Sequence, residues 1–132
     1  GKRFWLINTH FPYRAEDEAA REKGAAAIAA WIAARPDGAP VVLTGDFNTV
    51  PDSGTHNALS AGLADAWDAA KVRSGPAETF HAFTGKADRR IDWVFAKGLT
   101  AARVETVTFG RNGRYPSDHF PVVVDYRWPV KK

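Results

Sequence analysis

The sequence predicts one α/β unit across its 132 residues, on three observations. Two short apolar segments, 4–9 and 41–45, flank a long alanine-rich segment, which is the pattern of a strand–helix–strand crossover. Further segments of strand type follow after residue 90. The composition is 45% hydrophobic and 25% charged, as in a globular chain long enough to bury a core.

The first strand and the helix of the crossover are each predicted by their residue types. Residues 4–9 are apolar and aromatic, as in a strand. Acidic residues at 16–18 suit the positive first turn of a helix, and apolar residues then recur at helical spacing up to Ile32. Residues 35–38 contain a proline and a glycine, which end the helix.

The second strand of the crossover ends in polar side chains. Apolar residues 41–43 run into Gly45, and strand alternation then places Asp46 and Asn48 on the same side. Two oxygen-bearing side chains there suit a hard cation or a phosphate-bound water, although both residue types are also common in turns. Because parallel strands share the edge at which they end, we expect His10 and Asp46 on one rim of the sheet.

The rest of the chain predicts shorter elements. Residues 52–59 include a short helix, and 63–70 form either a second short helix or a loop. Alternating or apolar residues predict strands at 79–83, 91–95, 102–109 and 120–126. The Asn-Gly pair within 111–114 predicts a tight turn.

The composition excludes several kinds of site. The absence of cysteine excludes disulfides, a thiolate nucleophile and a cysteine zinc site. No apolar run has the length of a transmembrane helix, and the start shows no signal-peptide pattern. The formal net charge of +3 fits an anionic ligand without requiring nucleic acid.

Polar residues gather at four strand ends that the predicted topology brings toward one rim. Their types are those that a metal-assisted phosphoester hydrolase uses. Carboxylates hold a divalent cation that polarises the phosphoryl oxygen, and a histidine oriented by a carboxylate moves protons near neutral pH. The residues are Asn8 and His10, Asp46 and Asn48, Asp92, and Asp118 and His119.

These residues carry a resemblance to a known family. Four motifs occur in the order and approximate spacing of the endonuclease/exonuclease/phosphatase superfamily, which includes DNase I-like nucleases, inositol-polyphosphate 5-phosphatases and neutral sphingomyelinases. The motifs are Asn8-Thr9-His10, Gly45-Asp46-Phe47-Asn48, Arg90-Ile91-Asp92 and Ser117-Asp118-His119. The resemblance implies one half of a four-layer αββα sandwich, with a mixed, mostly antiparallel sheet flanked by helices.

The resemblance also implies roles for the residues. Asp46 and Asn48 orient the attacking water or contact the phosphate and a metal, Mg²⁺ or Mn²⁺, for which Asp118 is a further ligand. His119 is the acid/base group with Asp92 as its partner; His119 is the favoured base for the water and Asp46 is the alternative. The catalytic set includes His10, which matches the histidine of the DNase I-like branch. Asn8 is a supporting hydrogen-bonder and is assigned to phosphate binding. Independently of the resemblance, Arg90 and Arg114 flank motif loops and are also assigned to phosphate binding, with solvated loop charge as the alternative.

Residues 1–132 resemble the C-terminal part of such a domain only. The family's metal-binding glutamate belongs to the first half, so weak Mg²⁺ binding is expected. A single sheet with one uncovered apolar face predicts either a homodimer or a missing N-terminal half. Nucleic acid, phospholipid and inositol phosphate all remain open as substrates. The alternative function is a non-catalytic half-domain or assembly module.

Overall fold

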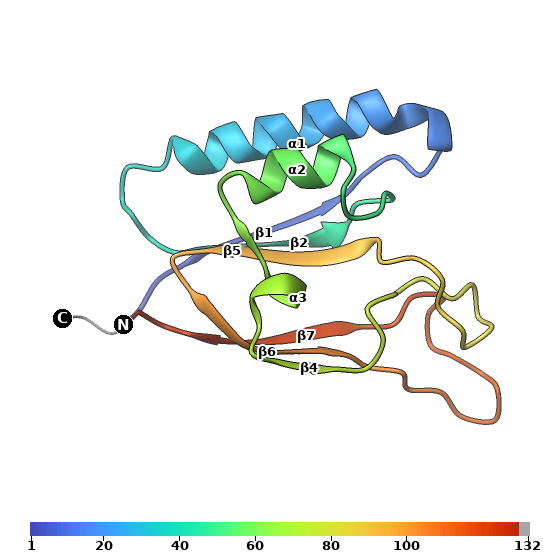
Figure 1. Cartoon of the computed structure of the whole chain (residues 1–132). Coiled ribbons are helices and arrows are strands. Elements are labelled where there is room, and N and C mark those ends of the chain that lie inside the picture. The colour runs from blue at the N-terminus through green and yellow to red at the C-terminus, as the bar shows by residue number, and fades with distance from the viewer. Residues whose placement is uncertain (130–132) are drawn as a thin grey trace.

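The computed structural model describes residues 1–129 and has three layers. Helices α1 and α2 cover one face of a four-stranded sheet, and a three-stranded sheet packs beneath the other face (Figure 1). The elements in chain order are β1 Trp5–His10, η1 Ala15–Asp17, α1 Glu18–Ala33, β2 Val41–Asp46, α2 Gly54–Ser60, β3 Ala64–Asp65, α3 Ala66–Ala69, β4 Val72–Ser74, β5 Asp92–Lys97, β6 Thr100–Thr106 and β7 Val122–Arg127.

The four-stranded sheet has the order β1-β2-β5-β3. Strands β1 and β2 are parallel with α1 between them in sequence, so the predicted crossover is confirmed. Strand β5 pairs antiparallel with β2. The pairing aligns His10 with Asp46 and Asp46 with Asp92, at the end of β1 and β2 and the start of β5.

The main core lies between this sheet and the two helices. Phe47 stacks on Trp93, with ring centroids 4.7 Å apart and an interplanar angle of 14°. Leu43 and Phe95 are fully buried beside them, and Leu59 of α2 closes the cluster. Because side chains alternate along a strand, burying Leu43 and Trp93 against the helices turns their neighbours to the opposite face.

A second sheet in the same chain corrects one expectation. We expected one sheet with an uncovered apolar face, but strands β4, β6 and β7 form a separate sheet that faces it. Gly98 has a φ of 76°, a left-handed conformation that favours glycine, and it lies in the turn by which the chain leaves β5 for β6. Val94 of β5 packs with Val122 and Val124 of β7 between the sheets.

The homodimer prediction was based on an uncovered apolar face of the sheet. Because the second sheet covers that face, the basis for the prediction is absent. Apolar side chains remain exposed next to β1, where Phe4 is 50% and Leu6 62% exposed. Others are exposed elsewhere on the described surface, at Val72, Phe83, Phe109 and Val123. Nothing in the described residues identifies a second copy of the chain as the group that covers them.

Further predictions differ from the structure in detail. The strand expected at 102–109 spans Thr100–Thr106. Residues 79–83 form no continuous strand: Phe80 makes isolated bridges to Arg89 and His119, and Ala82 and Phe83 have positive φ angles. The last strand begins at Val122 rather than Phe120. None of the helices in residues 1–129 is both long and apolar enough to span a membrane.

Candidate functional site

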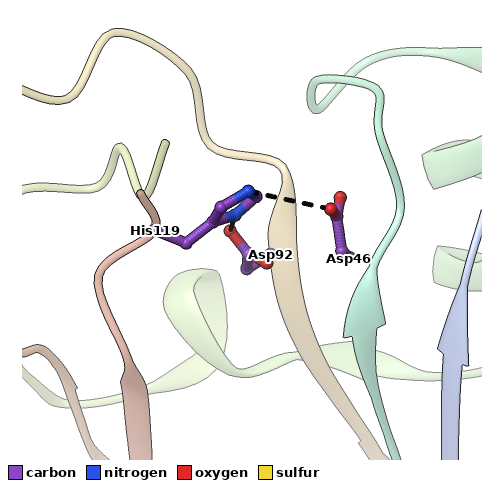
Figure 2. Close-up of side chains that lie close together, drawn as sticks. All are labelled: Asp46, Asp92 and His119. Atoms are coloured by element: carbon purple, nitrogen blue, oxygen red, sulfur yellow. Dashed lines mark hydrogen bonds and ion pairs between the residues drawn. The ribbon is translucent and has the colours of Figure 1, made fainter. Parts of the chain in front are cut away.

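The candidate site is a row of three side chains completed by a fourth from a loop. His10, Asp46 and Asp92 lie at the same level of three neighbouring strands, so their side chains emerge on one face of the sheet. That face is the one turned toward the second sheet. His119, from the segment before β7, reaches over from that sheet (Figure 2).

His119 lies between the two carboxylates. Its Nδ1 atom is 2.7 Å from Oδ2 of Asp92, and its Nε2 atom is 3.9 Å from Oδ2 of Asp46, as Figure 2 shows. A carboxylate contact at Nδ1 means that this nitrogen carries a proton and donates it. His10 approaches from the other side, with Nε2 3.4 Å from the same Asp46 oxygen, and its side chain is 71% exposed.

This arrangement shifts the pKa values of Asp46 and His119. Burial raises the pKa of the Asp46 carboxyl, and the nearby Asp92 charge adds to the increase, against the opposing effects of the Asn48 N–H and both imidazoles. Burial alone would lower the pKa of His119. The hydrogen bond to Asp92 and the charges of Asp92, Asp46 and Asp118 outweigh it, so the pKa of His119 is raised. The surrounding carboxylates thus favour the protonated form of the imidazole.

The row opens into a cleft between the two sheets. The cleft has a volume of about 350 Å³, enough for a small phosphoester group. One wall carries the polar groups of β1, β2 and β5. The other wall, from β7 and the residues before it, adds Ser117 and His119 to the apolar Phe120, Pro121 and Val122. Its lining comprises Asn8, Thr44, Gly45, Asp46, Asp92, Trp93, Val94, Ser117, His119, Phe120, Pro121 and Val122.

The donor set fits a hard divalent cation. Ligand atoms of Asp46, Asp92 and His119 all lie within 4.8 Å of one another. Oδ1 of Asp46 accepts the Asn48 N–H at 2.9 Å, whereas both contacts to its Oδ2 are long, at 3.4 and 3.9 Å. A cation beside Oδ2 would also offset the repulsion between Asp46 and Asp92, and carboxylate oxygens are the ligands that Mg²⁺ and Mn²⁺ prefer.

The structure places Asn48 and Asp118 differently from the three clustered residues. Asn48 has a φ of 51°, and its Nδ2 donates to the carbonyl of Phe11 at 2.9 Å, so part of its carboxamide braces the loop after β1. The Asp118 carbonyl accepts the N–H groups of His81 and Ala82. Its carboxylate is not in the three-residue cluster, to which Asp92 belongs.

Arg90 was predicted to bind phosphate, but in the structure it binds Asp65. It is only 9% exposed, and its Nη1 donates to Oδ2 of Asp65 at 2.8 Å. The same oxygen lies 2.9 Å from Nε2 of His56. Arg90 therefore compensates a buried carboxylate, and it does not line the cleft where a phosphate would bind. The guanidinium also occupies the position where a cation would bind the second acidic cluster, which comprises His56, Asp65 and Asp68.

Of the two remaining predicted phosphate ligands, one lies in the cleft. Asn8 lines it, and its Oδ1 accepts a hydrogen bond from the Thr44 hydroxyl at 2.9 Å, which directs the amide N–H groups away from Thr44. Arg114 lies in the exposed turn that it closes with Arg111 through two backbone hydrogen bonds. It does not line the cleft in this structure.

Thr44 and Ser117 also belong to the site, although no role was predicted for either from the sequence. Thr44 orients Asn8, and the Ser117 hydroxyl accepts the N–H of His119 at 3.1 Å, which fixes the turn that presents the imidazole. Both residues had a sequence signal. Thr44 lies two positions before Asp46 and so shares its face, and Ser117 begins the motif that ends in His119.

The family model of the Endonuclease/Exonuclease/phosphatase family matches residues 2–119. The chain belongs to this family. Its matched range contains Asn8, His10, Asp46, Asp92 and His119, which are the residues that the structure gathers at the cleft.

The chain is also similar to individual proteins and solved structures. The uncharacterized protein YbhP of Escherichia coli K12 is 32% identical over 123 residues, which are 92% of this chain and 46% of that protein. The chain therefore spans about half the length of the curated relatives it matches. A mannosyl-6-phosphatase of Bacteroides thetaiotaomicron has a TM-score of 0.85 at 28% identity, over 97% of this chain and 52% of that one.

More distant family structures share the fold alone. A structure of D. rerio TDP2 with a single-stranded DNA product has a TM-score of 0.75 at 21% identity, over 96% of this chain and 57% of that one. The two-sheet architecture is therefore that of the endonuclease/exonuclease/phosphatase fold, which a mannosyl-6-phosphatase and a protein solved with a DNA product also have.

Proposed function

We propose that this chain provides the proton-handling part of a divalent-metal-dependent phosphoester hydrolase. The observation that carries the proposal is the position of His119, between Asp92 at 2.7 Å and Asp46 at 3.9 Å, at the wall of a cleft. Membership of the endonuclease/exonuclease/phosphatase family supports the reaction class.

The reaction that we propose is attack by water on phosphorus, in line with the leaving oxygen. The new P–O bond forms as the bond to the leaving oxygen breaks, and the attacking water loses a proton. We assign that proton to Asp46, because Asp46 lines the cleft and its Oδ2 has only long contacts, at 3.4 and 3.9 Å, to the two imidazoles. This assignment favours Asp46 over His119, which was the base that we first expected.

His119 then acts as an imidazolium. The hydrogen bond to Asp92 and the nearby carboxylates favour the protonated ring, and its Nε2 is directed toward Asp46 at the cleft. There it donates a hydrogen bond to the phosphoryl oxygens as their charge grows, or a proton to the leaving oxygen. Asp92 fixes the tautomer from the other side and stays a carboxylate.

Mg²⁺ or Mn²⁺ is the cofactor that we propose, held by Asp46 and Asp92, with Asn48 and Asp118 as further candidate ligands. When bound, the metal supplies Lewis-acid polarisation of the phosphoryl group. His10 and Asn8 are the candidates for hydrogen bonds to the substrate phosphate, since both lie on the same face as Asp46. Arg114 stays a weaker candidate, because it lies outside the cleft.

The substrate class is a phosphate ester small enough to enter a cleft of about 350 Å³ at its reactive group. A similar protein is a mannosyl-6-phosphatase, which makes sugar phosphomonoesters one class to test. Nucleic acid, phospholipid and inositol phosphate are the other substrate classes to test. The net charge of +3 is compatible with each of these anions.

A non-catalytic half-domain is the second candidate. The observation that favours it is that the chain spans 46% of a curated relative and, in its described residues, brings only three potential metal-binding groups together at the cleft. In this reading, the motif residues are present but the metal is not held tightly enough for turnover.

One assay separates the two candidates. Hydrolysis of p-nitrophenyl phosphate and bis-(p-nitrophenyl) phosphate is measured with Mg²⁺ or Mn²⁺ for the wild type, His119→Ala and Asp125→Asn. Asp125 is exposed on β7, away from the cleft lining, and serves as the control. Metal-dependent activity that is lost in His119→Ala alone supports the hydrolase. Equal absence of activity in all three proteins supports the half-domain.

A further inference from the structure

Thr79 is a buried residue directly behind the site. It lies in the segment between β4 and β5, is 1% exposed, and does not line the cleft. The sequence analysis gave it no role, because it is thirteen positions from Asp92 and outside all four motifs. Its contacts nevertheless reach both members of the Asp92–His119 pair.

The hydroxyl of Thr79 makes three hydrogen bonds, all to Ile91 and Asp92. It accepts the N–H of Ile91 at 3.3 Å and that of Asp92 at 3.2 Å, and it donates to Oδ2 of Asp92 at 2.5 Å. A hydroxyl has one proton and two acceptor positions. Because both acceptor positions are taken by N–H groups, its proton is directed at the carboxylate.

The carboxylate oxygen that receives this proton is the one that binds His119. Oδ2 of Asp92 lies 2.5 Å from the Thr79 hydroxyl and 2.7 Å from Nδ1 of His119. The Thr79 carbonyl also accepts the N–H of Phe120 at 2.8 Å, next to His119 in the chain. Thr79 thus holds both partners. Its hydroxyl binds the Asp92 carboxylate and the β5 backbone, and its carbonyl binds the backbone next to His119.

We propose that Thr79 is the positioning residue of the Asp92–His119 pair, with its hydroxyl fixing Oδ2 of Asp92 against Nδ1 of His119. The consequence is that Nε2 of His119, and not Nδ1, faces the cleft. The proposal deepens the proposed function and rests on it for its catalytic meaning, whereas the positioning itself is a property of this chain alone.

The geometry explains why a hydroxyl is needed and why its isostere would fail. In Thr79→Val a methyl group replaces the hydroxyl, but a carbon atom contacts its neighbours at about 3.5 Å. The carboxylate must then shift by roughly 1 Å, which stretches the contact to His119 beyond hydrogen-bonding distance. Thr79→Ser keeps the hydroxyl and removes only the methyl group.

Thr106 offers a matched control. It is also buried, at 2% exposed, and its hydroxyl has no hydrogen-bond partner among the described residues. Thr106→Val therefore makes the same chemical change in a similar environment without removing a hydrogen bond.

The test is NMR of the histidine rings at one fixed pH, on protein labelled with ¹⁵N-histidine. In the wild type, Thr79→Ser and Thr106→Val, we expect a slowly exchanging, downfield His119 Nδ1–H signal and the ¹⁵N shifts of a ring with protonated Nδ1. In Thr79→Val the signal is lost and the shifts change. Where turnover is measurable, kcat falls about 10–100-fold in Thr79→Val with little change in KM.

An unchanged His119 signal in folded Thr79→Val overturns the proposal, and so does its loss in Thr79→Ser. If Thr79→Val does not fold, as judged from a collapsed amide spectrum, Thr79→Ala is measured instead with the same expectation and the same contrary result. The readout needs no substrate. An inactive wild type that shows the signal contradicts the proposed function and leaves the positioning role standing.

Discussion

The Nδ1 atom of His119 lies 2.7 Å from Oδ2 of Asp92, across an interval of 27 residues in the chain. The contact joins the two sheets of the sandwich, because Asp92 begins β5 of one sheet and His119 precedes β7 of the other. The chemistry of the imidazole therefore depends on how the two sheets are packed. The following predictions test this dependence and the packing behind it.

Replacing Asp92 by asparagine removes the charge behind His119 while keeping its size. We expect metal-dependent phosphoester hydrolysis to fall by about 10²–10⁴-fold, because the imidazole loses both its orientation and the stabilisation of its protonated form. Initial rates with the nitrophenyl substrates check this. Asp125→Asn removes an exposed carboxylate and should keep wild-type activity; equal rates in Asp92→Asn and the wild type would exclude Asp92 from catalysis.

Mn²⁺ or Mg²⁺ should stabilise the folded chain through Asp46. At a free metal concentration ten times the dissociation constant, the free energy of unfolding rises by roughly 1.4 kcal/mol. Asp46→Asn should abolish this increase, whereas Asp125→Asn should retain it. Thermal unfolding across a metal titration measures the effect, and an identical metal response in Asp46→Asn would place the cation elsewhere.

Asp65→Ala should destabilise the fold by about 3–5 kcal/mol, because it leaves the buried Arg90 guanidinium without its close partner. Asp68 is the matched control. It lies 3.9 Å from Arg90 but is exposed, so Asp68→Ala should cost no more than about 0.5 kcal/mol. Urea unfolding of the three proteins gives the comparison. Similar losses in both variants would contradict the assignment of Arg90 to an interior ion pair.

Asp65 should also contribute to acid unfolding. Burial alone would raise its pKa, but the hydrogen bond from His56 and the charge of Arg90 outweigh it, so the pKa of Asp65 is lowered. A lowered carboxyl pKa stabilises the fold above the unfolded-state value, about 3.9, and this contribution is lost as pH falls through the lower folded value. The difference in unfolding free energy between wild type and Asp65→Ala should therefore be constant above about pH 5. It should shrink below pH 4, and a constant difference down to pH 3 would contradict the lowered pKa.

Gly45→Ala should separate β1 from β2 beside the site. A Cβ atom at Gly45 would lie 2.2 Å from the carbonyl oxygen of Thr9, which is backbone and has little freedom to move. We expect a loss of about 1–3 kcal/mol or more and reduced activity, since His10 and Asp46 follow directly. Gly62→Ala, where no atom lies within 4 Å, is the control. Equal stability of the two variants would show that the strands separate without cost.

Local patterns predicted the parts of the site that depend on neighbouring strands. The crossover placed the ends of β1 and β2 on one edge, and the structure indeed aligns His10 with Asp46. Asp92 was recognisable as a carboxylate among apolar residues. These predictions succeed because strand direction and alternation are properties of short segments.

Contacts between distant segments were beyond such patterns. Arg90 adjoins a motif residue in sequence, but its guanidinium is directed at Asp65, 25 positions away. The second sheet was missed for two reasons. Strand β4 is only three residues long and gave a weak signal. In addition, which strands pair depends on tertiary contacts that the local sequence does not contain. Thr79 was missed for the same reason, since its role exists only where three segments meet.

The alignment of His10, Asp46 and Asp92 at one level of three strands has a consequence for assembly of the site. A slip of one residue in either pairing would shift a side chain by about 3.3 Å and turn it to the other face. Gly45 or Trp93 would then stand where a carboxylate belongs. A misaligned chain could keep its helices and much of its core, so the fraction of competent molecules depends on the fidelity of strand pairing as well as on stability.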